Sequence, residues 1–133
     1  MTKLALLVVS FALFLTCAGT VRAQSQSEMN ATAAADFAKV DKRLNIVYKK
    51  ILESLDDQGK KLLVASQRAW VAFRDAEADF EADSTARGGT MAPLIYSTTR
   101  SEVTEARIKQ LLDTYAIDNE EEAKKLGWKA PKK

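Results

Sequence analysis

Apolar residues that recur every three or four positions are the feature that most constrains the fold of this chain. Such spacing places side chains on one face of an α-helix, whereas a half-buried strand would alternate at every second residue. No part of the 133-residue sequence shows a competing strand pattern, so we predict an all-α fold. The first helical stripe consists of Phe37, Val40, Leu44, Val47, Tyr48, Ile51 and Leu55.

A second helical stretch is predicted over residues 60–83, after a polar break at residues 56–59 that ends in a permissive glycine. Large aromatic side chains at helical spacing usually belong to a core, so we expect this stripe to be buried. The short connection predicts an antiparallel hairpin between the first two helices. The stripe consists of Leu62, Ala69, Phe73, Ala76 and Phe80, with Leu63 and Trp70 beside it.

Two adjacent glycines at residues 88–89 interrupt the helical pattern, and a third helix is predicted over residues 93–115. Asp118 and Glu121 have the spacing of a capping box, which predicts a short additional helix that Gly127 would end. We expect the following Trp128 to pack back on the body. The expected architecture is a small antiparallel bundle of three main helices plus a short C-terminal helix.

The N-terminus has the composition of a cleavable export signal. Lys3 precedes an apolar run over residues 4–15, and small residues before the Ala23–Gln24 bond suit a signal peptidase. The run is shorter than the roughly 20 residues that a membrane span needs. We expect a signal peptide over residues 1–23, a flexible leader over 24–35, a helical domain over 36–127 and a basic tail over 128–133. A signal implies a periplasmic or secreted protein.

The single cysteine, Cys17, lies inside the predicted signal. Lipid attachment there would tether the protein to a membrane, but that pattern requires a small residue before the cysteine, where Thr16 stands. Cleavage after Ala23 removes the thiol, so we expect a mature domain that is held together by packing without a disulfide.

The net charge of the expected mature domain limits the classes of molecule that it could bind. Residues 24–123 contain 13 basic and 18 acidic residues, a net charge of −5. This balance argues against nucleic acid, whose phosphates require a basic face, and it suits a cationic protein partner.

Most catalytic residue types are missing. The chain has no histidine, and the expected mature domain has no cysteine, so we expect no catalytic residues, no metal site, no cofactor and no enzymatic activity. An alternating carboxylate run on the second helix is open to three interpretations: a solvated face, a protein-binding surface, or a catalytic or metal site such as that of a glycan hydrolase. The run consists of Asp75, Glu77, Asp79, Glu81 and Asp83.

A group of short motifs resembles the LprI-type lysozyme inhibitor family over about residues 36–112. The motifs are Gln67-Arg68-Ala69-Trp70, Phe73-Arg74-Asp75-Ala76-Glu77, Gly88-Gly89-Thr90, Leu44-Asn45 with Tyr48, and Val103-Thr104 with Arg107.

The resemblance implies a small exported bacterial helical protein that blocks a lysozyme or related muramidase. The alternative is an envelope interaction or scaffold module without inhibitory activity. The family usually carries one cysteine at the place of Ala78 and another near Thr99, and both are absent here. The candidate partner-binding residues are Arg74, Asp75, Glu77, Arg87, Gly88, Gly89 and Thr90.

Overall fold

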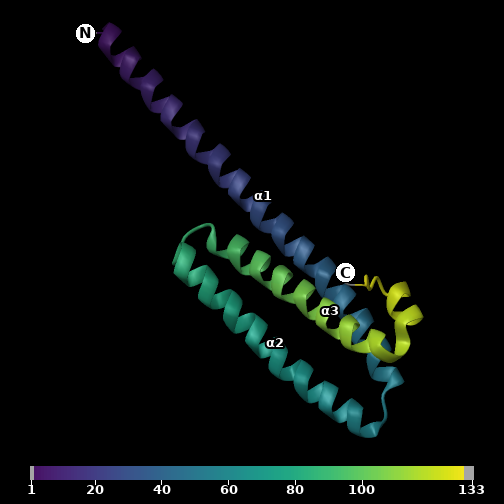
Figure 1. Ribbon diagram of the computed structural model, residues 1–133. Coiled ribbons are helices and arrows are strands. Elements are labelled where there is room, and N and C mark those ends of the chain that lie inside the picture. Colours follow the sequence, from purple (N-terminus) through teal and green to yellow (C-terminus); the bar gives the residue numbers. More distant parts are fainter. Residues whose placement is uncertain (1, 131–133) are drawn as a thin grey trace.

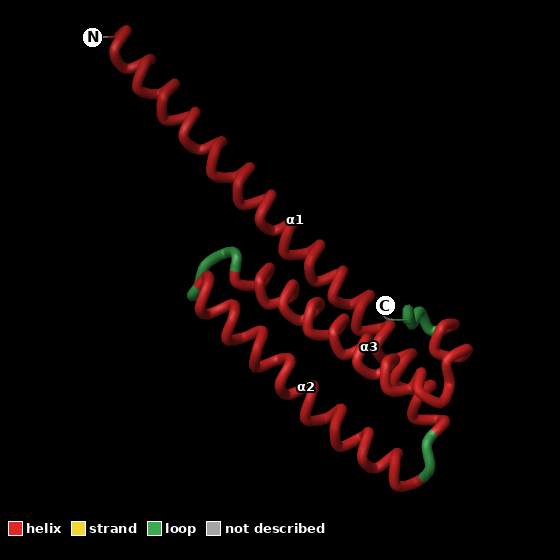
Figure 2. Tube along the Cα trace, viewed as in Figure 1, coloured by secondary structure: helices red, strands yellow, loops and turns green. Residues whose placement is uncertain are grey.

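The computed structural model describes residues 2–130, with side chains described from residue 25 onward. It consists of three helices, α1 (Thr2–Ser54), α2 (Asp57–Ala86) and α3 (Ala92–Lys125). Figure 2 shows that short loops join these helices and that the described residues contain no strand. The predicted all-α fold is therefore confirmed.

Helix α3 lies between α1 and α2, and all three run nearly parallel or antiparallel to one another (Figure 1). Both outer helices pack mainly on α3, while α1 and α2 make few contacts with each other. The first two helices do run in opposite directions, but they are not packed as a hairpin, because α3 occupies the space between them.

The core forms where α1 meets α3. Leu44, Val47 and Ile51 of α1 are buried there, as the helical spacing predicted. The members from α3 are Ile108, Leu111, Leu112, Tyr115, Ala116 and Ala123.

The apolar stripe of α2, predicted to be core, is exposed instead. The exposed fractions of Leu62, Phe73 and Phe80 are 62%, 55% and 64%. Ala69 and Ala76 on the same stripe are also exposed. The prediction was wrong because the packed face of α2 is built around a buried arginine and small residues, which a hydrophobic pattern does not reveal. The residues of that face are Arg74, Ala78 and Ala82, with Leu63 and Trp70 partly buried beside them.

The start of α2 also differs from the expected glycine turn. Asp56 is the N-cap, and its Oδ1 accepts a hydrogen bond from the backbone N–H of Gly59 at 2.7 Å. Gly59 therefore lies within the first helical turn rather than in the break.

Residues 24–35, predicted to be a flexible leader, lie within α1. The alanines among them favour a helix that continues the domain's first helix without interruption. Asn30 fixes this segment to the rest of the protein, because its Nδ2 donates to the carbonyl oxygen of Thr90 at 3.1 Å. The side chains of the predicted signal, Cys17 included, lie outside the described residues, as do residues 131–133 of the basic tail. Among residues 25–130, whose side chains the structure describes, no helix has the length and apolarity to cross a membrane.

The predicted short C-terminal helix is not separate: it is the last part of α3, which runs to Lys125 and is kinked at one non-helical residue, Asn119 (φ −137°, ψ 45°). The end of the helix agrees with the prediction. Gly127 adopts a positive φ of 94°, and the backbone N–H of Trp128 donates to the carbonyl of Ala123 at 2.9 Å. Trp128 also packs against the core, as predicted.

Candidate functional site

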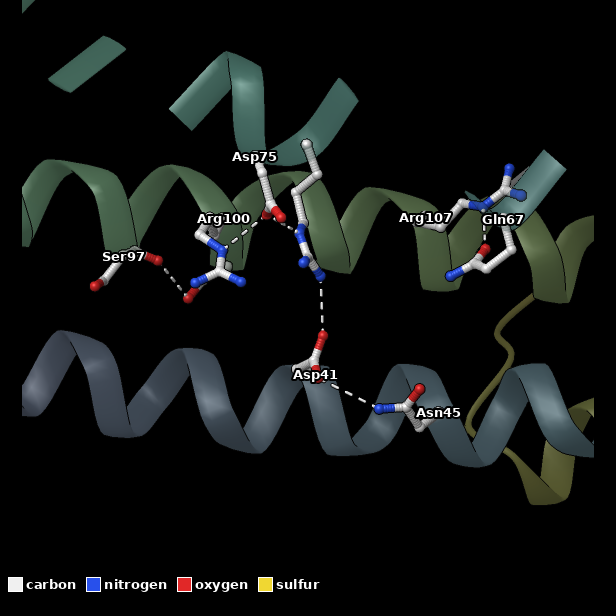
Figure 3. Close-up of polar contacts among 9 residues, drawn as sticks. Asp41, Asn45, Gln67, Asp75, Ser97, Arg100 and Arg107 are labelled. Atoms are coloured by element: carbon white, nitrogen blue, oxygen red, sulfur yellow. Dashed lines mark hydrogen bonds and ion pairs between the residues drawn. The ribbon is translucent and has the colours of Figure 1, made fainter. Parts of the chain in front are cut away.

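Arg74 is the buried charge at the junction of the three helices. Only 6% of its side chain is exposed. Its Nη1 donates to Asp41 Oδ1 on α1 at 2.9 Å, and its Nε donates to Asp75 Oδ1 at 2.9 Å. Figure 3 shows this chain of contacts crossing from α2 to α1. The guanidinium also lies 5.2 Å from the ring centroids of Phe37 and Trp70.

Arg100 adds α3 to the same cluster. Its Nε lies 3.1 Å from Asp75 Oδ1, so Asp75 faces two guanidinium groups (Figure 3). The Arg100 guanidinium also stacks 3.8 Å from the centroid of the Phe37 ring. Two carboxylates, Asp41 and Asp75, thus balance the two cations Arg74 and Arg100 between the helices.

Arg107 forms a second polar link between α2 and α3. Its guanidinium donates to Ser66 Oγ at 2.9 Å and to Gln67 Oε1 at 3.2 Å, both on α2. A third hydrogen bond, 2.7 Å long, reaches Gln110 Oε1 on α3 itself. Burial lowers the pKa of Arg107, but an arginine starts so far above neutrality that the group stays charged. Together, Arg74, Arg100, Arg107 and their partners hold the three helices against one another.

The structure divides the seven predicted partner-binding residues into two groups. Arg74 and Asp75 belong to the interhelical cluster, and Glu77 is half-buried on the next turn of α2. The other four, residues 87–90, are exposed in the turn between α2 and α3. About 18 Å of helix separates Asp75 from Arg87 at 1.5 Å per residue. The two groups are therefore not brought together in one compact site.

The turn at residues 87–90 is tight and well connected. Gly88 has a φ of 65°, which favours glycine, and the backbone N–H of Gly89 donates to the Ala86 carbonyl at 2.7 Å. Arg87 pairs with Asp83 one helical turn back at 2.9 Å. Since Thr90 is held by Asn30, this turn is tied to α1.

An open acidic groove lies between α1 and α3, with a volume of about 630 Å³. Glu28 and Asp36 on α1 and Glu102 on α3 line it, together with the apolar side chains of Met29 and Leu94. None of its lining residues is basic. The groove was not predicted from the sequence, because residues 24–35 were expected to be a flexible leader. The alanine-rich run before Asp36 was the available signal that the helix begins earlier.

The alternating carboxylates of α2 do not converge. Asp75 is paired inside the interhelical cluster, Asp83 is paired with Arg87, and Asp79 is exposed. Among the residues that the structure describes, no group of three or more histidine, cysteine, aspartate or glutamate side chains is arranged to hold a metal ion.

The chain is similar in sequence to known proteins over a region that includes this cluster. A family model described as "Lysozyme inhibitor LprI" matches residues 17–111. The chain belongs to the LprI family. A curated relative, the uncharacterized protein R02472 of Rhizobium meliloti (strain 1021), is 30% identical over 103 residues, which cover 68% of this chain and 73% of the relative. No solved structure matches the chain.

The two places where the family resemblance led us to expect cysteines, Ala78 and the region near Thr99, lie on α2 and α3 respectively. Ala78 of α2 is completely buried, and Thr99 of α3 is half-buried. In this member of the family, Arg100 and Arg107 connect α3 with α2, and Arg74 connects α2 with α1, without a covalent bond.

Proposed function

We propose that this protein acts outside the cytoplasm as a binding protein that blocks a cationic lysozyme. Membership of the LprI family supports a role in lysozyme inhibition. The observation that carries the proposal for this chain is the acidic groove between α1 and α3, whose lining has three carboxylates and no basic residue.

Charge supports this choice of partner. Residues 24–123 have a net charge of −5, and complementary charge speeds the encounter between two proteins. The groove offers Glu28, Asp36 and Glu102 to the basic side chains of a lysozyme, while Met29 and Leu94 offer apolar contact. Asp36 already pairs with Lys39 at 2.8 Å, and this exposed pair would be exchanged on binding. The exposed turn at residues 87–90 lies beside this region, because Thr90 is bonded to Asn30 on α1. We therefore assign the groove and the turn together to the lysozyme-binding surface.

The test is a cell-wall turbidity assay, paired with a direct binding measurement, against several types of lysozyme. Glu28→Gln/Asp36→Asn/Glu102→Gln removes the groove's three charges, and we expect it to weaken inhibition by roughly tenfold or more, about 1.4 kcal/mol. Glu53→Gln/Asp57→Asn/Asp118→Asn changes three exposed carboxylates outside the groove by the same total charge and should stay within about twofold. Inhibition by the unmodified protein should weaken as salt is raised.

Two results would count against the proposal. Absence of binding and inhibition at micromolar concentration with every lysozyme tested would leave the alternative of an envelope scaffold module. Equal losses in the two triple variants would mean that net charge matters but the groove does not.

Export is tested separately by N-terminal sequencing of the protein recovered from periplasm. A mature chain that begins at Gln24 is the expected result. A chain that retains residues 1–23, or that carries lipid on Cys17, would contradict it.

A further inference from the structure

The apolar stripe on the outer face of α2 has no partner within the described chain. Leu62, Phe73 and Phe80 are each more than half exposed, and the stripe faces away from α3. It extends about 27 Å along the helix from its first to its last member. A surface of this kind usually marks an interaction site.

We propose that α2 pairs antiparallel with α2 of a second copy of this chain, and that this stripe forms the seam of a symmetric dimer. This inference goes beyond lysozyme inhibition, because the acidic groove lies on α1 and α3 and the seam lies on the outer face of α2.

The spacing of the stripe is that of a packing seam between two helices. Leu62, Ala69 and Ala76 follow one another at intervals of seven, and Phe73 and Phe80 form a second series with the same interval. From Ala69 to Phe80 they follow the four-, three- and four-residue steps of a heptad pattern, and Leu62 lies one full heptad before Ala69. The intervening heptad position is Ser66, whose Oγ accepts a hydrogen bond from Arg107 of α3. Single exposed apolar residues scattered on a surface would not keep this register over several turns.

The sizes of the side chains fit an antiparallel pair. If residue 71, near the middle of α2, lies at the two-fold axis, Phe73 of one copy faces Ala69 of the second copy and Phe80 faces Leu62. Each aromatic ring thus meets a smaller side chain, as interdigitating layers require. The stripe is centred on the same residue as the helix, so the two helices overlap along nearly their whole length.

The charges beside the stripe select the same orientation. Lys61 and Arg68 are exposed on the N-terminal half of α2, and Asp79 and Asp83 are exposed on its C-terminal half, on the same side of the stripe. Antiparallel pairing brings the basic half of one helix beside the acidic half of the other. In a parallel pair this side of one stripe would face the other side of its partner's stripe, so these opposite charges would not meet.

Sedimentation velocity of the purified chain over a concentration series tests whether the dimer forms. We expect a shift from monomer to dimer as concentration rises into the micromolar range, and loss of the dimer in Phe73→Glu and Phe80→Glu at unchanged helix content. Ile46→Glu introduces the same charge at an exposed apolar residue of α1 and should leave the dimer intact. A chain that remains monomeric up to roughly 100 μM would overturn the proposal, whether or not the stripe binds lipid vesicles or a lysozyme.

Two further measurements test the orientation. In a Cys17→Ser background, Ala72→Cys places a thiol near the two-fold axis and should form a disulfide between copies. Ala65→Cys lies on the same side of the stripe but away from the axis, so it should not form one. Crosslinking of both variants would indicate parallel pairing and overturn the proposal. Lys61→Glu should weaken the dimer, because Lys61 lies beside Asp79 of the second copy in this register, and the added Asp79→Arg should restore it. The absence of restoration would also count against the antiparallel seam.

Discussion

Replacement of Arg74 by alanine should strongly destabilise the protein. The guanidinium is 6% exposed, and it makes two charge-assisted hydrogen bonds of 2.9 Å, to Asp41 and Asp75. Removing one partner of a fully buried ion pair costs about 3–5 kcal/mol. Here the side chains of Asp41 and Asp75 are 36% and 38% exposed, so water can partly solvate the two carboxylates that lose their partner. We therefore expect a loss of about 3 kcal/mol.

This loss should lower the Tm by about 10 °C in a domain of this size, measured by circular dichroism and by urea denaturation. Arg87→Ala is the matched control. Arg87 also pairs with an aspartate at 2.9 Å, but its side chain is 83% exposed, so its removal should cost no more than about 0.5 kcal/mol.

Arg74→Lys keeps the charge but loses the planar fork that contacts two carboxylates, and its stability should fall between those of the unmodified protein and Arg74→Ala. If Arg74→Ala and Arg87→Ala melted at the same temperature, the buried cluster would not be a source of stability, and this reasoning would be refuted.

Three further predictions concern the register of α2, its cap and the C-terminal segment. Trp70→Ala should lower the free energy of unfolding by about 2–4 kcal/mol, somewhat less than the loss for a fully buried tryptophan. Phe73→Ala should change the free energy of unfolding of the dilute monomer by less than about 1 kcal/mol, because Phe73 is exposed. If urea denaturation gave the larger loss for Phe73→Ala, α2 would be rotated relative to the structure described above. Asp56→Ala removes the cap of α2 and should cost about 1 kcal/mol, while Asp56→Asn should retain most of the stability. Hydrogen bonds from Lys109 and, to a smaller extent, from Trp128 hold the pKa of Asp113 below its ordinary value. The stabilisation from these hydrogen bonds is complete at pH values above the ordinary pKa and is lost as the pH falls through the lowered pKa. Trp128 fluorescence should therefore change over this acidic range in the unmodified protein, and this change should be absent in Asp113→Asn.

The helical class, the first core stripe and the end of α3 could be predicted because each depends on local sequence. Leu44, Val47 and Ile51 show the helical period directly, and Gly127 supplies the positive φ that ends the last helix. The face that α2 buries could not be found in this way. Its central residue is Arg74, and burial of an arginine depends on Asp41, which lies 33 residues away in the sequence.

The candidate site was predicted only in part for a similar reason. The turn at residues 87–90 is visible as a local glycine pair. The acidic groove requires Glu28 and Asp36 of α1 to lie opposite Glu102 of α3, and no local pattern reports that pairing. The exposure of the α2 stripe could not be predicted either. A heptad pattern looks the same in the sequence whether the partner helix lies in the same chain or in another.

The position of α3 between the other two helices affects the order in which the protein can fold. Contacts such as Asn30 with Thr90 and Arg43 with Glu105 join residues that are 60 and 62 positions apart. A chain that emerges from the ribosome N-terminus first therefore presents the apolar face of α1 long before its partner has been synthesised. The α2–α3 hairpin can form from nearby residues, but α1 has to wait for the last third of the chain. The apolar face of α1 therefore stays without its packing partner until nearly all of the chain has been made.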